Sequence, residues 1–285
     1  MYVHSLLPLR ALYGLSYVLY ILVYKIVGYR VEVVRTNLKN SFPDKNTEEL
    51  KSVEREFYRH FCDYFVETIK VIHMSDKEIQ KRIVFKNMDM VKDLIKEGNS
   101  CLMYLGHYGN WEWVPSITRH FEDGEQLAQI YRQLRNKAMD DIFLKLRKRF
   151  GSLGIEKGQT FREIIRLKKE KVKCVIGFMS DQNPSPRNIH YWTDFLNQDT
   201  PVYTGVERIA KKTGFVVTYL DVVRVRRGYY ECTVKLISDK PADEPQFAIT
   251  ERYIREMEKT ILRNPAYWLW THKRWKYKRE DFEQA

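Results

Sequence analysis

The stretch Ser100–Phe121, SCLMYLGHYGNWEWVPSITRHF, is the part of the sequence that decides the fold. It opens with an uncharged apolar run, Ser100–Leu105, which has the length and composition of a buried β-strand. Gly106–Asn110 follows as a turn with two glycines, and Trp111–Phe121 is predicted to form the next helix. A buried strand that passes through a tight turn into a helix is the repeating unit of α/β proteins.

The same alternation continues on both sides of this stretch. Leu127–Tyr131 and Lys173–Met179 are predicted to be further buried strands, and Phe215–Val225 and Tyr229–Ile237 are predicted to pair as a hairpin. Predicted helices cover Thr47–Met74, Val91–Lys96, Lys137–Phe150, Pro201–Gly214 and Phe247–Leu262. We therefore expect an α/β fold: a single domain with a central, largely parallel sheet flanked by helices.

Length and composition agree with a folded enzyme-sized domain. The chain has 285 residues, of which 44% are hydrophobic and 30% charged, and this balance excludes a disordered protein. Lys and Arg (49) exceed Asp and Glu (37), which gives a net charge of +12 and indicates an anionic partner. The four cysteines, which lie far apart, lack zinc-ligand spacing and are predicted to be small buried side chains in a reducing compartment: Cys62, Cys101, Cys174 and Cys232.

The N-terminal segment is uncharged from Ala11 to Val23. Its tyrosines recur at helical spacing on one face, which suits a position at a membrane surface: Tyr13, Tyr17, Tyr20 and Tyr24. We expect residues 1–30 to be a membrane anchor, spanning or half-buried, and residues 31–285 to be the catalytic domain. The alternative is a soluble helix that docks on the core. Arg30, Arg35 and Lys39 follow the segment and favour a cytoplasmic position for the rest of the chain.

His107 and Glu112 form a His-x-x-x-x-Glu pair in the turn after the first strand. The same spacing of histidine and glutamate occurs at His73 and at His120, but only His107 directly follows a buried strand and a glycine. Ligands of such sheets bind beyond the carboxyl ends of the strands. If the chain folds back, Glu112 can hydrogen-bond the imidazole and leave the other ring nitrogen as a general base. The alternative is a contact that only caps the helix.

The segment GHYGNWEW at 106–113 resembles the signature of the late acyltransferases of lipid A biosynthesis, the lauroyl/myristoyl acyltransferase family. Other blocks resemble that family in the same order along nearly the whole chain. These blocks are Arg35-Thr36-Asn37-Leu38 to Phe42-Pro43, Tyr131-Arg132, Ser180-Asp181-Gln182, Pro201–Gly214 and Pro265–Arg274. The resemblance implies a glycerolipid-acyltransferase-like domain.

The resemblance also implies roles for individual residues. His107 is the expected general base and Glu112 its charge partner. Arg132, Asp181 and Asn110 are the expected residues that bind substrate or support catalysis. The sequence departs from the family pattern at Gln133, where proline is usual, and at Asn197, where the glycine of a Phe-Phe-Gly segment is expected.

The implied reaction is an acyl transfer that needs no metal, nucleotide or other cofactor. The donor is expected to be acyl carrier protein, or acyl-CoA, and the acceptor the hydroxyl of a hydroxyacyl chain on a lipid A precursor. Backbone N–H groups at the start of the helix at Trp111 are expected to stabilise the charge that develops on the thioester oxygen. The expected location is the bacterial inner membrane, with the catalytic domain on its cytoplasmic face.

Two alternatives stay open at this level. The first keeps the chemistry but changes the acceptor to another bacterial hydroxyacyl lipid, such as an ornithine or glycine lipid. The second is a basic nucleic-acid-binding protein, which the charge and the aromatic content of 14% permit. The absence of a recognised nucleic-acid-binding motif and the uncharged N-terminal segment argue against nucleic acid as a partner.

Overall fold

A computed structural model describes residues 5–131, 137, 140, 146 and 149–283. In this part of the chain the strands form one seven-stranded sheet in the order β1-β9-β8-β2-β5-β3-β4 and a separate two-stranded hairpin, β6-β7. The strands of the large sheet are β1 (Ile83–Lys86), β2 (Cys101–Leu105), β3 (Gln126–Tyr131), β4 (Leu153–Glu156), β5 (Cys174–Met179), β8 (Val216–Arg226) and β9 (Tyr229–Ser238). Every neighbouring pair in this sheet is parallel except β8 and β9, which confirms the predicted α/β class with a largely parallel sheet.

Helical segments cover both faces of this sheet. Met103 and Leu105 of β2 face the 3₁₀ segment η3 (Trp111–His120), whereas Tyr104 between them stacks on Tyr253 of α10 (Ala248–Arg263) with ring centroids 4.0 Å apart. Because neighbouring side chains on a strand point to opposite faces, η3 and α10 lie on opposite sides of β2.

The helices are α2 (Leu9–Tyr20), α3 (Val31–Ser41), α4 (Thr47–Lys70), α5 (Asp76–Arg82), α6 (Met88–Lys96), α8 (Thr160–Lys169), α9 (Gly205–Thr213), α10 (Ala248–Arg263) and α11 (Glu280–Glu283). The shorter or non-α segments are η1 (Ile21–Ile26), η2 (Val71–His73), η3 (Trp111–His120), η4 (Lys157–Gln159), η5 (Pro186–Asn188), η6 (Pro241–Asp243) and η7 (Pro265–Tyr267).

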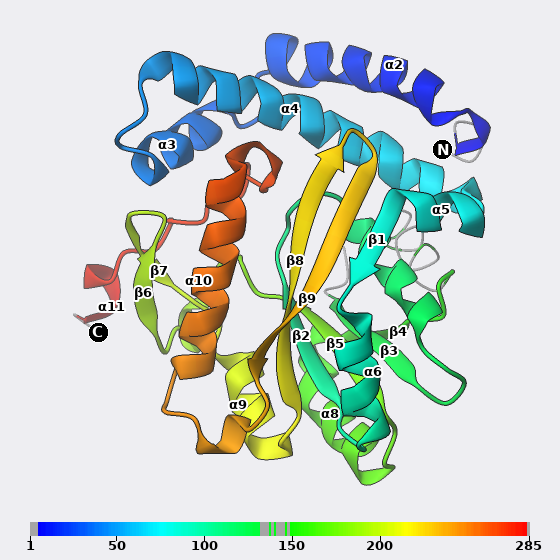
Figure 1. The fold of residues 1–285 in the computed structure, drawn as a ribbon. Helices are drawn as coiled ribbons and strands as arrows, with labels where there is room; N and C mark the ends of the chain where they lie inside the picture. The colour runs from blue at the N-terminus through cyan, green and yellow to red at the C-terminus, as the bar shows by residue number, and fades with distance from the viewer. Residues whose placement is uncertain (1–4, 132–136, 138–139, 141–145, 147–148, 284–285) are drawn as a thin grey trace.

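The long helix α4 crosses the end of the molecule where the β8–β9 hairpin turns (Figure 1). It begins with a capping box in which the Asn46 side chain accepts hydrogen bonds from the backbone N–H groups of Glu48 and Glu49, and the Glu49 carboxylate accepts one from the backbone N–H of Asn46. The helix predicted over Thr47–Met74 is thus confirmed, with its last residues in the 3₁₀ turn η2.

The helix α2 runs antiparallel to α4 and lies along it (Figure 1). Side-chain hydrogen bonds join the two helices from Tyr13 to Glu67 (2.9 Å) and from Ser16 to Asp63 (2.7 Å). From the π-helical segment η1, Tyr24 reaches Glu54 (2.8 Å). Leu9–Ile26 is the one stretch of the described residues long and apolar enough to cross a membrane, and only 22% of it is buried. The outer face of this stretch is therefore available to a membrane.

The structure corrects the predicted helix start at Pro201. Pro201 ends β7 (Gln198–Pro201), which pairs with β6 (Trp192–Phe195), and the helix α9 begins only at Gly205. The two turn residues, Leu196 (φ 51°) and Asn197 (φ 60°), both have positive φ, as a two-residue hairpin of type I′ requires. Asparagine tolerates this conformation better than most residues, which explains how it can occupy a position where glycine is expected.

Other predicted elements are confirmed with small shifts. The predicted helix over Trp111–Phe121 is 3₁₀ rather than α and contains Pro115, which has no N–H to donate within the helix. The four cysteines are buried free thiols. The predicted helix Lys137–Phe150 falls largely outside the described residues.

Candidate active site

The loop after β2 is shaped by its two glycines. A Cβ atom at Gly106 would overlap the end of the Met257 side chain of α10, so a larger residue there would require that side chain to move. Gly109 has φ 62°, and its N–H donates to the carbonyl oxygen of Tyr267 at 3.0 Å. Between them, Tyr108 pairs with Trp268 as an isolated β-bridge. The loop is therefore held against the C-terminal segment, and His107 is fixed at the carboxyl end of β2.

His107 is held by Asp181, which follows β5. The imidazole Nδ1 lies 2.7 Å from Asp181 Oδ1, and the His107 backbone N–H donates to Oδ2 at 2.9 Å. The Trp268 indole donates a third hydrogen bond to Oδ2 at 2.8 Å. β2 and β5 are parallel neighbours with Leu105 opposite Met179, so the residues that follow the two strands meet at the same edge of the sheet.

The environment of Asp181 keeps this carboxylate charged. Burial by itself raises the pKa of Asp181, but the nearby charge of His107 and the hydrogen bonds from His107 and Trp268 outweigh it and lower the pKa to about 2. The Asp181 side chain is 1% exposed and that of His107 is 16% exposed. A buried carboxylate thus holds a histidine that solvent or a substrate can reach.

The second ring nitrogen of His107 points away from Asp181. Nε2 lies 3.4 Å from the Gln182 side-chain nitrogen, and the imidazole contacts the Trp111 ring edge-on with centroids 5.2 Å apart. Because Asp181 accepts the proton on Nδ1, Nε2 is the nitrogen left to accept a proton from a substrate.

The other predicted site residues lie at different places around the loop. The carboxylate on Nδ1 is that of Asp181 and not that of Glu112, which is buried in the first turn of η3. Asn110 donates to Glu67 of α4 at 2.9 Å and so anchors the loop to that helix. Arg132 lies outside the described residues.

A buried polar cluster below Asp181 was not predicted as part of the site. Arg274 is fully buried and donates to Asn183 Oδ1 at 2.9 Å, while His272 Nε2 lies 3.3 Å from the Asn183 amide nitrogen. Burial lowers the pKa of Arg274 to about 10 and the pKa of His272 to about 4. The Trp-x-His-x-Arg block of the sequence was the signal that could have located this cluster. Trp268, two residues before this block, is the residue of the C-terminal segment that hydrogen-bonds Asp181 directly.

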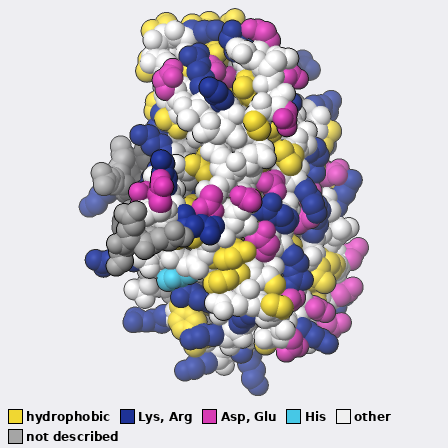
Figure 2. Space-filling view, turned by 90° about the vertical axis from the view of Figure 1, so that its left-hand side faces the viewer, with side chains coloured by type: hydrophobic (Ala, Val, Ile, Leu, Met, Phe, Trp, Pro, Cys, Tyr) yellow, Lys and Arg dark blue, Asp and Glu magenta, His cyan; other side chains and the backbone are white. Residues whose placement is uncertain are grey.

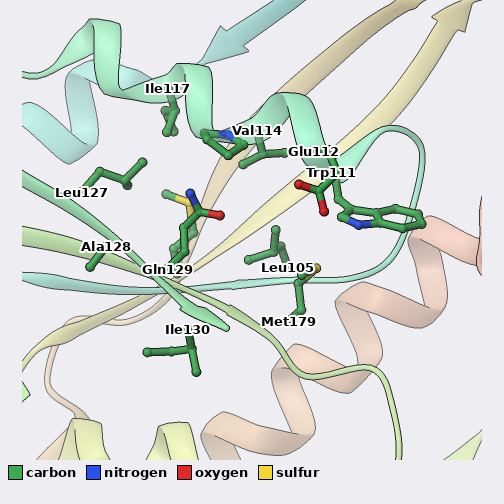
Figure 3. A pocket seen from close by; sticks show the side chains of 13 residues that line it. Leu105, Trp111, Glu112, Val114, Ile117, Leu127, Ala128, Gln129, Ile130 and Met179 are labelled. Atoms are coloured by element: carbon green, nitrogen blue, oxygen red, sulfur yellow. The ribbon is translucent and has the colours of Figure 1, made fainter. Parts of the chain in front are cut away.

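An apolar pocket lies beside the loop, between η3 and the sheet (Figure 3). Trp111, Glu112 and Leu105 stand at one end of it, and Ile117 and Leu127 at the other. Its lining is apolar except for Glu112 and Gln129. The full lining is Met103, Leu105, Trp111, Glu112, Val114, Pro115, Ile117, Leu127, Ala128, Gln129, Ile130, Gly177 and Met179. The cavity that these residues enclose has a volume of only about 30 Å³, so a hydrocarbon chain would have to widen it by moving η3 away from the sheet.

The model of the family described as bacterial lipid A biosynthesis acyltransferase matches residues 1–277. The chain belongs to this family. The acyltransferase is 22% identical over 249 residues to the lipid A biosynthesis palmitoleoyltransferase of Escherichia coli strain K12, an alignment that covers 87% of this chain and 79% of that protein. It is equally similar, with the same coverage, to a lipid A biosynthesis acyltransferase of Shigella flexneri.

The structure places an imidazole with one nitrogen fixed by a carboxylate next to an apolar lining. Such a histidine is chemically able to remove a proton from a hydroxyl. Among the described residues, no group of three or more His, Cys, Asp or Glu side chains is placed to hold a metal ion.

Proposed function

We propose that this acyltransferase moves a fatty acyl chain from an acyl carrier protein thioester to a hydroxyl of a lipid A precursor, as a secondary acylation. The observation that carries the proposal is the His107–Asp181 pair at the carboxyl end of β2, directly beside the apolar pocket. The family membership supports acyl transfer in lipid A biosynthesis and disfavours a role in binding nucleic acid.

In the proposed step, His107 Nε2 takes the proton of the acceptor hydroxyl while Nδ1–H donates to Asp181. The hydroxyl oxygen attacks the thioester carbonyl carbon, so that a C–O bond forms and the C–S bond breaks. The thiolate of the carrier protein leaves and takes the proton from Nε2. Asp181, charged at neutral pH, stabilises the imidazolium that exists between the two proton transfers.

Glu112, Asn110 and Arg132 have separate proposed roles. Glu112 stands at the end of the pocket nearest Trp111 and acts next to the reacting carbonyl rather than at Nδ1 of His107. Asn110 holds the loop through Glu67, so that the backbone N–H groups at the start of η3 face the thioester oxygen. Arg132 is the proposed cation of the site, because it directly follows β3, whose residues line the pocket.

The membrane supplies the acceptor, and α2 is the proposed contact with it. Three hydrogen bonds tie α2 and η1 along α4, which supports a helix lying in the membrane surface with its outer face in the lipid. Residues 1–30 are then the anchor of a catalytic domain formed by residues 31–285. We place this domain on the cytoplasmic face of the bacterial inner membrane, where acyl carrier protein is available.

The decisive experiment measures acyl transfer from a radiolabelled acyl carrier protein thioester to a tetra-acylated lipid A precursor, using protein purified in detergent. His107→Ala should lose activity by about 10³-fold or more, because general acid–base catalysis is lost. Asp181→Asn and Glu112→Gln, compared in parallel, separate the two carboxylates. Asp181→Asn should lower kcat and alter its dependence on pH, because Asp181 holds the proposed base. Glu112→Gln should lower kcat without altering its dependence on pH.

Activity of His107→Ala close to that of wild type would contradict the proposed base. Transfer by wild type to an ornithine or glycine lipid, but not to the lipid A precursor, would replace the acceptor and leave the mechanism intact. If acyl-CoA serves as well as the carrier thioester, the proposed donor is wrong.

A further inference from the structure

A second hollow lies between α2, α4 and the β8–β9 hairpin, apart from the apolar pocket. Its volume is about 690 Å³, within the range of roughly 300–1,000 Å³ typical of small-molecule sites. Four arginines line it, together with two carboxylates: Arg55, Arg59, Arg224, Arg227, Glu56 and Asp63. We call it the arginine groove.

The two carboxylates of the groove are already engaged. Asp63 is 3% exposed, accepts hydrogen bonds from Ser16 and Arg227 and lies 3.4 Å from Arg224. Glu56 accepts a hydrogen bond from the Tyr267 hydroxyl at 2.6 Å. The groove therefore keeps more positive charge than its own acidic residues neutralise.

The surplus charge belongs to Arg55 and Arg59. Both are exposed, and within the described part of the chain no carboxylate pairs with either guanidinium. Arg59 lies over the Tyr20 ring at 5.6 Å, which directs it toward α2. Arg224 adds a further donor, since its side chain is only 10% exposed and its buried Nε has no partner among the described residues. Arginines with unused donors in a hollow are typical of phosphate recognition.

The groove opens beside the proposed membrane contact. Tyr17 lines the groove from α2 and is 58% exposed, and Val18 next to it is 51% exposed. In Figure 2 hydrophobic side chains lie along the upper end of the molecule, where Figure 1 has α2, with Lys and Arg side chains next to them. An anion that enters the groove from this side comes from the head-group layer of a membrane.

The groove also shares α4 with the catalytic loop. Asp63 of the groove is followed by Tyr64, which stacks on Trp111 at 4.2 Å, and Glu67 one turn further on accepts from Asn110. The span from Arg55 to Glu67 is roughly 18 Å at 1.5 Å per residue, which is within the reach of one lipid molecule. Arg224 is linked to the same loop through Tyr267 of η7, because its guanidinium lies 4.7 Å from the Tyr267 ring and the Tyr267 carbonyl accepts from Gly109.

We propose that the arginine groove binds a phosphate group on the head group of the acceptor lipid and so presents the hydroxyl of that lipid to His107. This inference rests on the proposed function for the identity of the acceptor, but not for the binding of a lipid phosphate. Arg55 and Arg59 supply the charge, and Arg224 supplies the buried donor that orients the phosphate oxygen.

The test uses full-length protein and the double variant Arg55→Gln/Arg59→Gln. Flotation with vesicles of phosphatidylcholine alone, and of phosphatidylcholine mixed with phosphatidate, measures the contribution of a lipid phosphate. The double variant should lose about tenfold in affinity for the phosphatidate vesicles, because two charge-assisted contacts are removed, with little change on phosphatidylcholine. The charge-matched control is Arg187→Gln/Arg208→Gln, exposed arginines that do not line the groove and should leave both affinities unchanged.

Equal loss in both double variants would mean that only net charge matters and would overturn the proposal. Inorganic phosphate that competes as tightly as the lipid would make a soluble phosphate the ligand, which also contradicts it. Arg55→Lys/Arg59→Lys, which retains the charge, should recover much of the binding and exclude misfolding as the cause.

The kinetic arm addresses the acceptor. In the acyl-transfer assay, Arg55→Gln/Arg59→Gln should raise the acceptor KM about tenfold with kcat and donor KM nearly unchanged, since the lost contact is equal in ground and transition states. An unchanged acceptor KM would show that the bound lipid is not the acceptor and would contradict the proposal. If wild type transfers no acyl group, the proposed function fails, and the vesicle measurement alone decides whether the groove binds a lipid phosphate.

Discussion

Asp181 is the residue whose charge depends most directly on the geometry of the site. Its carboxylate is buried but receives hydrogen bonds from the ring and backbone of His107 and from Trp268. These contacts bring its pKa to about 2, against an ordinary value of 3.8. The ionised form is therefore more favourable in the folded protein than in the unfolded chain, and this difference stabilises the fold at every pH above the ordinary pKa.

The replacement Asp181→Asn should remove this stabilisation. At pH 5 we expect the free energy of unfolding to fall by about 2 kcal/mol, because a pKa difference near two units corresponds to about that energy. As the pH falls through 4 toward 2, wild-type Asp181 becomes protonated and the difference between the two proteins should shrink. Urea unfolding at pH 5, 4 and 3 measures it.

Asp199→Asn is the matched control, because Asp199 pairs with Arg279 in an ion pair whose side chains are 41% and 46% exposed. Such a surface pair contributes about 0–1 kcal/mol, so its loss should have little effect at any of these pH values. A stability difference for Asp181→Asn that stays constant from pH 5 to pH 3 would show that its hydrogen-bond geometry, and not its charge, stabilises the fold.

The sequence indicates the proposed base, His107, more directly than the carboxylate at its Nδ1. His107 could be located because a buried strand, a glycine and a histidine are consecutive, and Asp181 because it follows another buried strand. Their pairing depends on β2 and β5 being neighbours, and strand order is not encoded in local periodicity. Glu112 is closer to His107 in sequence, but the three-dimensional neighbour at Nδ1 is a residue 74 positions away.

At the scale of elements, the pocket is built by η3 and three adjacent strands. Met103 and Leu105 come from β2, Leu127 and Ala128 from β3 and Gly177 from β5. The sequence predicted the three strands because each is a short apolar run. The pocket itself could not be predicted, because it requires η3 to pack over the parallel strands without filling the space between them.

We expect Ala128→Leu to shorten the acyl chain that the enzyme prefers. Ala128 is fully buried and lies near Leu127 toward the end of the pocket away from Trp111 (Figure 3), so a larger side chain would take the space that the end of a long chain needs once the pocket has widened. Activity with the longest donors should fall about tenfold or more, because each methylene group that can no longer be buried loses about 0.8 kcal/mol of burial free energy. Activity with shorter donors should be retained. Competition among acyl carrier protein thioesters of different lengths measures this preference.

Ala210→Leu controls for the cost of overpacking, because Ala210 is equally buried but lies in α9 and does not line the pocket. It should lower stability without changing the order of preferred donors. The assignment of the pocket to the acyl chain is wrong if Ala128→Leu lowers activity with all donors by the same factor.

The elements that the sequence missed are those with little hydrophobic periodicity. In the β6–β7 hairpin the polar residues are consecutive rather than alternating, Thr193-Asp194 in one strand and Gln198-Asp199-Thr200 in the other, and the hairpin is closed by Leu196 and Asn197, a turn without glycine. Its strands are four residues long, too short for a periodic signal, and the Thr-Pro pair at its end is typical of a helix start. Here tertiary contacts decide the structure, since Asn197 donates to the Ser41 carbonyl of α3 at 3.0 Å.

At the scale of the whole molecule, α2 and α4 connect the loop of His107 with the proposed membrane contact. One face of α2 is held by polar contacts to α4, and Tyr13 and Asn110 both donate to Glu67. The opposite face of α2 and of η1, which continues it, is apolar and exposed, with Val18 of α2 51% and Leu22 of η1 44% exposed. A helix with one polar, bonded face and one free apolar face is suited to lie in a membrane surface, and its movement would be transmitted to the loop through Glu67.

This arrangement predicts that membrane binding and folding can be separated by the face of α2 that is changed. The double variant Val18→Asp/Leu22→Asp, on the outer face, should move the protein from the membrane fraction to the soluble fraction, because charged side chains oppose burial in lipid. Its free energy of unfolding in detergent-free buffer should change by less than about 0.5 kcal/mol per site, as is usual for exposed positions.

Ser16→Val, on the inner face, should lower the free energy of unfolding and leave the protein in the membrane fraction. It removes the hydrogen bond to buried Asp63 and leaves that carboxylate with fewer donors. Sedimentation of membranes and chemical unfolding of the same three proteins measure both properties. If Val18→Asp/Leu22→Asp stays membrane-bound in high salt, the outer face of α2 is not the anchor, and the surface that meets the lipid must lie elsewhere on the molecule.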